Sequence, residues 1–288
     1  MRATPRSSPY LAEILLLDPE RDHRRIVYLD TCYEFPFDIT RSLEFALFRT
    51  FAVPSIGGLL DSTGEFPARP QKRYDDTDIL ISAMLEHGYQ SDVGKRALRR
   101  MNSLHSRFEI ANDDFVYVLS SFVCEPIRWI DRFGWRRMVE AERLAHYHYW
   151  RQIGRRMNIR DIPGSYEELE RFNAAYERER FGRTEASRRV GAVTRDMFLA
   201  WFPFVPRRLG APVIYALMDD ALLDAFGFPR PRPRVRRAVE ALLRARARAV
   251  RHLPPRRRPR LRTHMRRQSY PHGYVLEELG PPPPGAPV

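Results

Sequence analysis

The 288 residues carry a net charge of +13 and are 43% hydrophobic, which is enough to fill a sizeable core and excludes disorder of the whole chain. The only two cysteines, Cys32 and Cys124, belong to no CxxC pair or other metal-ligand spacing, which argues against a disulfide framework. No run approaches the roughly 18 apolar residues of a membrane-spanning helix, and the N-terminus lacks a secretory-signal pattern, so we expect a soluble, cytoplasmic protein.

Helical periodicity dominates the sequence, and the alternation typical of strands is scarce. We therefore predict a mainly α fold, a single globular multi-helix bundle with an extended C-terminal tail. The predicted helices cover residues 41–51, 73–87, 94–108, 112–130, 135–157, 165–181, 184–202, 212–226 and 232–252.

The net positive charge comes from the C-terminal part of the chain. Residues 1–229 hold 33 basic and 33 acidic side chains, whereas residues 230–288 hold 16 arginines and three acidic residues. We predict a domain boundary here, with an Arg/Pro-rich helix and flexible tail over 230–288. We expect few packed contacts from 254–288 outside Tyr270–Leu279, and modest destabilisation when 254–288 is removed.

The arginines of this tail allow two interpretations. They could bind nucleic acid or an anionic membrane, or they could form a solvated helix and arm in an arginine-biased sequence. We favour the solvated arm because no aromatic side chains alternate with the arginines. Nucleic acid is therefore not an expected partner, and peripheral membrane contact is left open.

A predicted helix pair brings together three residues that could carry chemistry. Thr77 lies 11 residues before Gly88, and His105 lies 11 residues after Gly94. In an antiparallel hairpin each lies roughly 16 Å from the turn, at about 1.5 Å per residue, so the two are level. Arg73 is one turn from Thr77 and shares its face. A flat cofactor between the helices would meet an imidazole on one side and a hydroxyl with a guanidinium on the other.

Spacing alone leaves this site open, because a lone histidine on an apolar helix face is usually a packing residue. The same reasoning applies to a second candidate metal site at His146 and His148. These two are i, i+2 on a predicted helix and so point to different faces. We predict solvated or packing roles for both.

Longer stretches of the sequence resemble the MpaB-like oxygenases, a family that includes latex-clearing rubber oxygenases and a fungal enzyme that cleaves a prenyl side chain. The resemblance covers residues 20–228 and a closing motif, and it rests on the order and spacing of its parts. These parts read YEFPFDITRSLEFALFRTFAVPSIGGLLDSTGEF, RYDDT, HG, SLHSRFEIANDDFVYVLSSFVCEPIRWIDRFGWR, AERLAHYHYWRQIGRRMNIRDIPGSYEE and YPHGYVLEELGP.

This resemblance implies a catalytic domain over 1–229 that binds haem b, with His105 of SLHSRF as the iron ligand. It also implies that Arg73 and Thr77 lie beside the haem as cofactor-binding and catalytic residues. Rubber oxygenases carry a lysine just before that threonine, where this sequence has Asp76. We expect Asp76 to turn outward and the sixth iron position to be open or to hold water. The family's acidic base has no clear counterpart, and Glu65 is the nearest carboxylate.

The leading hypothesis is a haem-dependent oxygenase that uses O2 on a hydrophobic substrate, with isoprenoid or lipid-like molecules as the candidates. The second is a haem-binding sensor or carrier without oxygenase turnover. The third is a cofactor-free helical module that binds nucleic acid or membrane through its arginines. A Soret absorbance band would show that the chain binds haem and would exclude the cofactor-free module. Oxygen consumption would then distinguish the oxygenase from the sensor or carrier.

Overall fold

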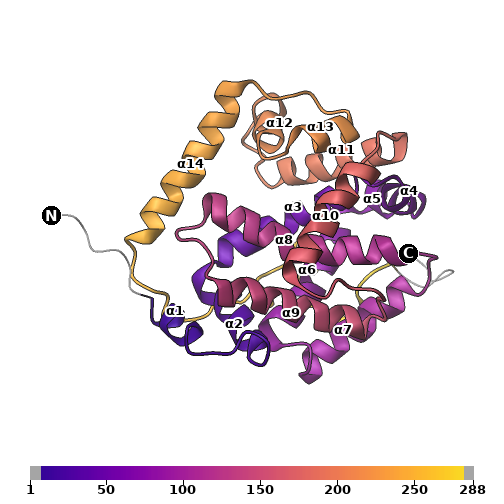
Figure 1. Ribbon diagram of the computed structural model, residues 1–288. Helices are drawn as coiled ribbons and strands as arrows, with labels where there is room; N and C mark the ends of the chain where they lie inside the picture. Colours follow the sequence, from indigo (N-terminus) through magenta and orange to yellow (C-terminus); the bar gives the residue numbers. More distant parts are fainter. Residues whose placement is uncertain (1–7, 282–288) are drawn as a thin grey trace.

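The computed structural model describes residues 8–281, and these residues form a bundle of α-helices without a β-strand, which confirms the predicted fold class. The helices are α1 (Pro9–Ile14), α2 (His23–Leu29), α3 (Pro36–Thr50), α4 (Pro54–Ser62), α5 (Glu65–Ala68), α6 (Pro70–His87), α7 (Asp92–His105), α8 (Asn112–Phe133), α9 (Glu140–Arg156), α10 (Tyr166–Arg180), α11 (Glu185–Ala200), α12 (Arg207–Ala216), α13 (Asp220–Phe226) and α14 (Pro233–Arg251). In Figure 1, α11, α12 and α13 lie on one side of the bundle, α7 and α9 on the other, and α3, α6 and α8 between them.

Every segment predicted to be helical contains a helix. Several boundaries differ by a few residues, and two of the differences have identifiable reasons. The stretch 135–157 becomes helical only at Glu140, where the carboxylate of Glu142 accepts a backbone hydrogen bond and caps the helix start. The stretch 212–226 is divided into α12 and α13, because Asp219 caps a new helix in its middle. Helices α1, α2, α4 and α5 were not predicted, since each is too short to show a clear period.

Two large hydrophobic clusters hold most of the bundle together, and α3 contributes to both. The larger cluster joins α3 to α2, α6, α8 and α9. The smaller cluster is rich in phenylalanine and joins α3 to α11 and α13. Within the described residues no single helix is long and apolar enough to cross a membrane, although α3 and α4, which meet at a bend of 92°, reach that length and hydropathy together.

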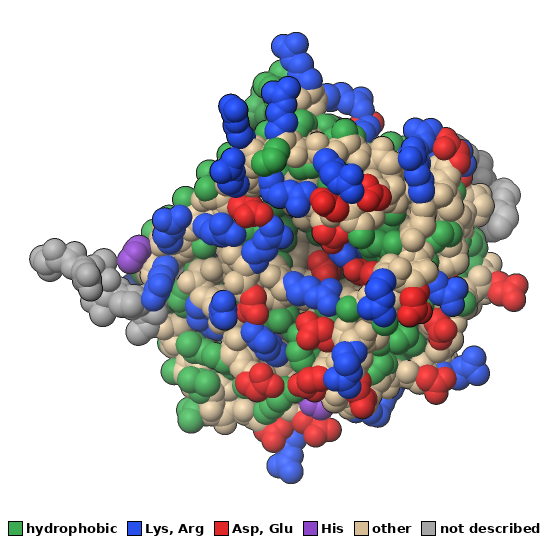
Figure 2. Space-filling view, turned by 45° about the horizontal axis from the view of Figure 1, so that its top comes forward, with side chains coloured by type: hydrophobic (Ala, Val, Ile, Leu, Met, Phe, Trp, Pro, Cys, Tyr) green, Lys and Arg blue, Asp and Glu red, His purple; other side chains and the backbone are tan. Residues whose placement is uncertain are grey.

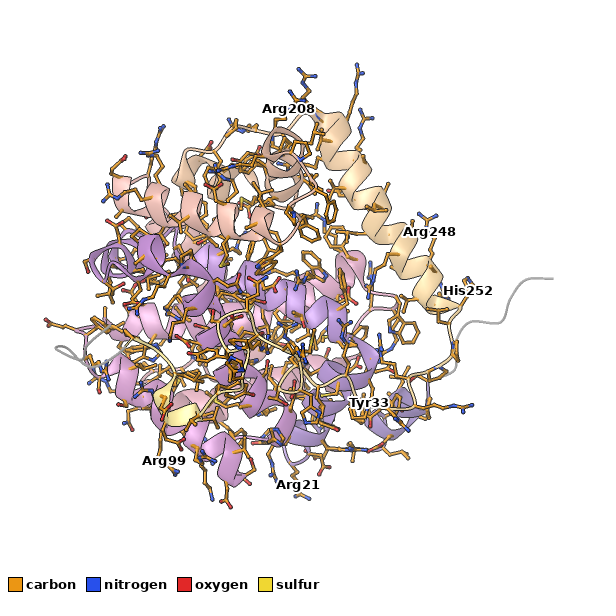
Figure 3. The ribbon with its side chains drawn as sticks, turned by 180° about the vertical axis from the view of Figure 1, so that it is seen from behind. Arg21, Tyr33, Arg99, Arg208, Arg248 and His252 are labelled. Atoms are coloured by element: carbon orange, nitrogen blue, oxygen red, sulfur yellow. The ribbon has the colours of Figure 1, made fainter. Side chains whose placement is uncertain are left out.

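The chain beyond α14 lies along the bundle as an extended segment, and we call residues 254–281 the strap. Figure 3 shows it leaving α14 at His252 and crossing the back of the molecule toward a short 3-10 helix near Arg99. Leu276 and Leu279 of the strap are buried in the larger core cluster. The extended conformation predicted for the tail is therefore confirmed.

The prediction that the strap makes few contacts outside Tyr270–Leu279 is wrong. Arg262 donates to the Asp78 carboxylate at 2.8 Å. The backbone N–H groups of Arg262 and Thr263 donate to Glu86 at 2.5 and 3.1 Å. Arginine-rich composition resembles that of a solvated arm, but here the arginines neutralise carboxylates that α6 carries. The strap is thus part of the folded unit.

Candidate functional site

The predicted pairing of residues 73–87 with residues 94–108 is confirmed by α6 and α7, which pack against each other. Gly88 ends α6 with a φ of 78°, a backbone conformation that L side chains rarely adopt. Ser91 caps α7 by accepting a hydrogen bond from the Gly94 backbone N–H at 3.0 Å. Gly94 is required as well, because a Cβ there would lie 2.1 Å from the Gly88 carbonyl oxygen. The short turn therefore sets the two helices antiparallel.

Arg73 and Thr77 lie one turn apart on α6 and bond to each other. The Arg73 guanidinium donates to the Thr77 hydroxyl, which in turn donates to the Arg73 carbonyl at 3.0 Å. The guanidinium also lies 5.9 Å from the ring centroid of Phe66. Within residues 8–281 no carboxylate forms an ion pair with it, and burial lowers its pKa. Arg73 is thus a partly buried cation with donors left for an anionic group.

His105 ends α7, and its ring meets Phe115 edge to face at a centroid distance of 5.5 Å. Its Nδ1 atom is buried and has no hydrogen-bond partner in the described part of the chain. Burial lowers the pKa of His105 to about 4, and the positive charge of nearby Arg73 contributes to that shift. The imidazole is therefore neutral at pH 7 and keeps a nitrogen lone pair available. Arg73 is thus near enough to His105 for its charge to affect the pKa of that ring.

Arg73 and Thr77 line a cavity between α3, α6 and α11 that holds about 450 Å³ of empty space, part of it open to solvent. His105 does not line it. The cavity walls are mainly aromatic and apolar, which suits an apolar ligand. These wall residues include Phe48, Phe51, Phe66, Met197 and Phe198.

Glu44 is a candidate functional residue that the sequence reasoning missed. It lines this cavity and also a neighbouring one between α3 and α6. Its carboxylate accepts hydrogen bonds from the Tyr74 hydroxyl and from Arg41, both at 2.6 Å. Burial raises the pKa of Glu44 to about 7. The signal in the sequence was a glutamate within the apolar run SLEFALF. Glu65, the carboxylate that we considered instead, pairs with Arg69.

The raised pKa of Glu44 predicts how stability depends on pH. Because the pKa rises from 4.5 to about 7 on folding, the folded chain binds more protons in that range, and stability falls as pH rises through it. Glu44→Gln removes this titration, while the other buried carboxylates titrate in both proteins. Urea denaturation at about pH 5 and about pH 8 should show the wild type losing more stability than Glu44→Gln. Parallel pH profiles would contradict the assignment.

The expectation that Asp76 turns outward is wrong. Asp76 is only 4% exposed and pairs with Lys72 at 2.9 Å. It also accepts a hydrogen bond from the hydroxyl of Tyr270 in the strap. The strap covers this face of α6, which is why a carboxylate can be buried there with its partners. A lysine at this position would meet Lys72 and the strap.

The two histidines considered for a second metal site lie in different surroundings on α9. His146 is buried, and its Nε2 lies 3.2 Å from the Asp30 carboxylate. His148 is partly buried and packs against the Tyr147 ring at 5.1 Å. Among the described residues no group of three His, Cys, Asp or Glu side chains is arranged to hold a metal ion. The Nδ1 atom of His146 is buried without a hydrogen-bond partner among the described residues, and burial lowers the pKa of this histidine to about 4.

Comparison with known proteins gives a family for this arrangement. Residues 45–252 match the family model described as "ER-bound oxygenase mpaB/B'/Rubber oxygenase, catalytic domain". The chain is 30% identical over 240 residues to "ER-bound oxygenase mpaB'" of Penicillium brevicompactum, which covers 77% of this chain. It is 30% identical over 210 residues to "ER-bound oxygenase mpaB" of Penicillium roqueforti (strain FM164), which covers 67% of this chain.

A third relative, "ER-bound oxygenase mpaB" of Penicillium brevicompactum, is 37% identical over 132 residues, or 44% of this chain. The chain spans 57%, 70% and 34% of the lengths of these three relatives, in the order given. The matched region of the family model contains Arg73, Thr77 and His105 as well as the cavity between α3, α6 and α11.

Proposed function

The chain belongs to the family of mpaB-type and rubber oxygenases, and from this premise we propose that it is a haem-b-dependent oxygenase that uses O2 on an apolar small molecule. The observation that carries the proposal is the buried, unpartnered Nδ1 of His105 on a neutral imidazole. The guanidinium of Arg73, which has no ion-pair partner among the described residues, lies within electrostatic range of that ring.

These residues fit haem b. Haem brings four nitrogen ligands of its own and needs one protein side chain to hold its iron, and neutral histidine is a common choice. His105 is neutral and keeps a lone pair. Haem also carries two propionates, and a guanidinium forms strong charge-assisted hydrogen bonds with carboxylates. Arg73 offers such a group without competing carboxylates at ion-pair distance within residues 8–281.

When bound, haem iron supplies the binding and activation of O2. The chain's own residues then orient and shelter the reactants. Arg73 and Thr77 fix each other through two hydrogen bonds, so the hydroxyl keeps one orientation toward the cavity. The aromatic side chains line that space with apolar surface. Glu44, with a pKa of about 7, can hold or release a proton at the cavity wall near neutral pH.

The lining of the cavity supports an apolar substrate, and we propose an isoprenoid or lipid-like chain as its class. The rings of four phenylalanines line the cavity and can contact hydrocarbon: Phe48, Phe51, Phe66 and Phe198. Arg73, Tyr74 and Thr77 place polar groups on the α6 side. Apolar walls with a few placed polar groups are typical of small-molecule sites.

Oxygen uptake by the haem-loaded protein tests this function, with farnesol as the isoprenoid probe. Uptake should depend on farnesol and should fall about 100-fold in Arg73→Leu, in line with the loss of one preorganised polar group. Arg69→Leu is the matched control, because Arg69 pairs with Glu65 one turn before and does not line the cavity. Haem binding without farnesol-dependent uptake in the wild type would favour a sensor or carrier instead. Equal oxygen uptake by Arg73→Leu and Arg69→Leu would show that Arg73 does not act in the site.

A further inference from the structure

The connection from α11 to α12 exposes an unusual amount of apolar surface. Phe202 is 50% exposed and Phe204 is 80% exposed. Leu209 and Val213 on α12 are 61% and 43% exposed. We call these four residues the apolar patch. Large apolar side chains left in water forgo the stabilisation that burial gives, so a cluster of this kind usually marks a surface that another body covers.

Basic side chains accompany the apolar patch. Arg208 is exposed and forms no ion pair in the described chain. Figure 3 shows Arg208 beside the N-terminal end of α14, where Arg232 and Arg234 are exposed or partly exposed as well. Figure 2 shows basic side chains projecting from the upper edge of the molecule, with hydrophobic side chains between them.

The acidic residues of this region are already paired. Asp196 forms ion pairs with Arg195 and Arg207. Asp220 forms an ion pair with Arg236 at 3.1 Å. Asp224 forms an ion pair with Arg230 at 2.8 Å. The unpaired charge beside the patch is therefore positive, which favours a partner with negative charge.

We propose that the apolar patch and Arg208 form a docking surface for an anionic lipid bilayer. Aromatic and aliphatic side chains at the tip of a connection can enter the boundary between headgroups and acyl chains, and arginine binds lipid phosphate. A second copy of this chain fits less well. A symmetric contact through the patch would bring the Arg208 side chains of both copies near each other, and like charges oppose such a contact.

The patch lies at the end of the helix that lines the cavity. Met197 and Phe198 of α11 line the cavity beside Arg73 and Thr77, and Phe202 follows four residues after Phe198. A chain docked by the patch would hold this end of the cavity toward the bilayer, where an apolar substrate accumulates. This consequence for substrate entry rests on the proposed function, whereas the docking itself does not.

Vesicle co-sedimentation of the full chain tests the docking. We expect binding to vesicles of phosphatidylcholine with about 30% phosphatidylglycerol, and at least tenfold weaker binding to phosphatidylcholine alone. Phe204→Ser and Arg208→Glu should each lower the partition coefficient on anionic vesicles about tenfold. Leu16→Ser and Arg248→Glu are the controls and should not change it. Leu16 is 88% exposed after α1. Arg248 lies in the last turn of α14, whereas Arg208 of α12 lies beside the N-terminal end of α14 (Figure 3).

Unchanged melting temperatures of the variants would show that the patch is not needed for folding. Three results would overturn the proposal. The first is equal partition of Phe204→Ser and the wild type on anionic vesicles. The second is lipid-free dimerisation that Phe204→Ser abolishes, seen by sedimentation velocity, which would make the patch an interface between copies. The third is oligonucleotide binding that competes with vesicles and depends on Arg208 but not on Phe204. Docking can fail in this way while farnesol-dependent oxygen uptake persists, so the two proposals fail separately.

Discussion

Protein in which His105 is replaced by alanine is expected to purify with less than about a tenth of the haem found in the wild type. Loss of a residue that only supports a metal ligand costs about 10–100-fold in affinity, so loss of the ligand itself should cost at least as much. Alanine has no lone pair to offer, and His105 has no hydrogen bond through Nδ1 whose loss could explain the result instead. The pyridine haemochrome absorbance per mole of protein measures the haem content.

Two controls distinguish ligation from damage to the fold. His148→Ala removes a partly buried histidine of α9 and should keep the haem. His105→Gly leaves space for added imidazole, which should restore the haem content that the variant loses. A normal haem content and spectrum in His105→Ala would show that His105 is not the ligand.

Removal of residues 254–288 is expected to leave the chain unable to fold stably, a much larger effect than the modest destabilisation that composition predicted. Asp78 and Glu86 would keep their places on α6 without the strap groups that now donate to them. The truncation would also remove Leu276 and Leu279 from the larger core cluster, and each buried aliphatic side chain contributes about 1.5–3 kcal/mol. The whole stability of a domain is about 5–15 kcal/mol. Circular dichroism and solubility of the truncated protein measure the outcome.

Point variants make the role of the strap measurable even if the truncated protein aggregates. Leu279→Ala truncates a side chain that is 0% exposed and leaves a cavity in the core. It should lower the free energy of unfolding by about 2–5 kcal/mol. Arg257→Ala, at an exposed position of the same segment, is the matched control and should change little. A soluble truncated protein with wild-type stability would show that the strap is a solvated arm and not part of the folded unit.

The helix pair could be predicted from the sequence because its signals are local. Apolar side chains recur at the helical period on both sides of GYQSDVG, and Gly88 and Gly94 mark the ends of the turn. Counting residues from that turn predicts that Thr77 lies level with His105, and this register stays a prediction. Arg73 of the same pair contributes to the lowered pKa of His105.

The surroundings of the site could not be predicted, because they depend on contacts between distant parts of the chain. Arg262 and Asp78 are separated by 184 residues, and neither has a local pattern that points to the other. Asp76 would face water on an isolated α6, and only the strap explains its burial. In the sequence Glu44 is a single charged residue in an apolar helix. Its contact with the hydroxyl of Tyr74 depends on the packing of α6 against α3, which no local pattern predicts.

Titration of haem-free protein with haem b, followed by absorbance at the Soret band, tests the central claim most directly. The wild type should bind one haem per chain with a saturable Soret shift, while His105→Ala should show no saturable shift at the same concentrations. A wild-type protein without a saturable shift, or a His105→Ala protein that follows the wild-type curve, would contradict the assignment of His105 as the residue that holds haem iron.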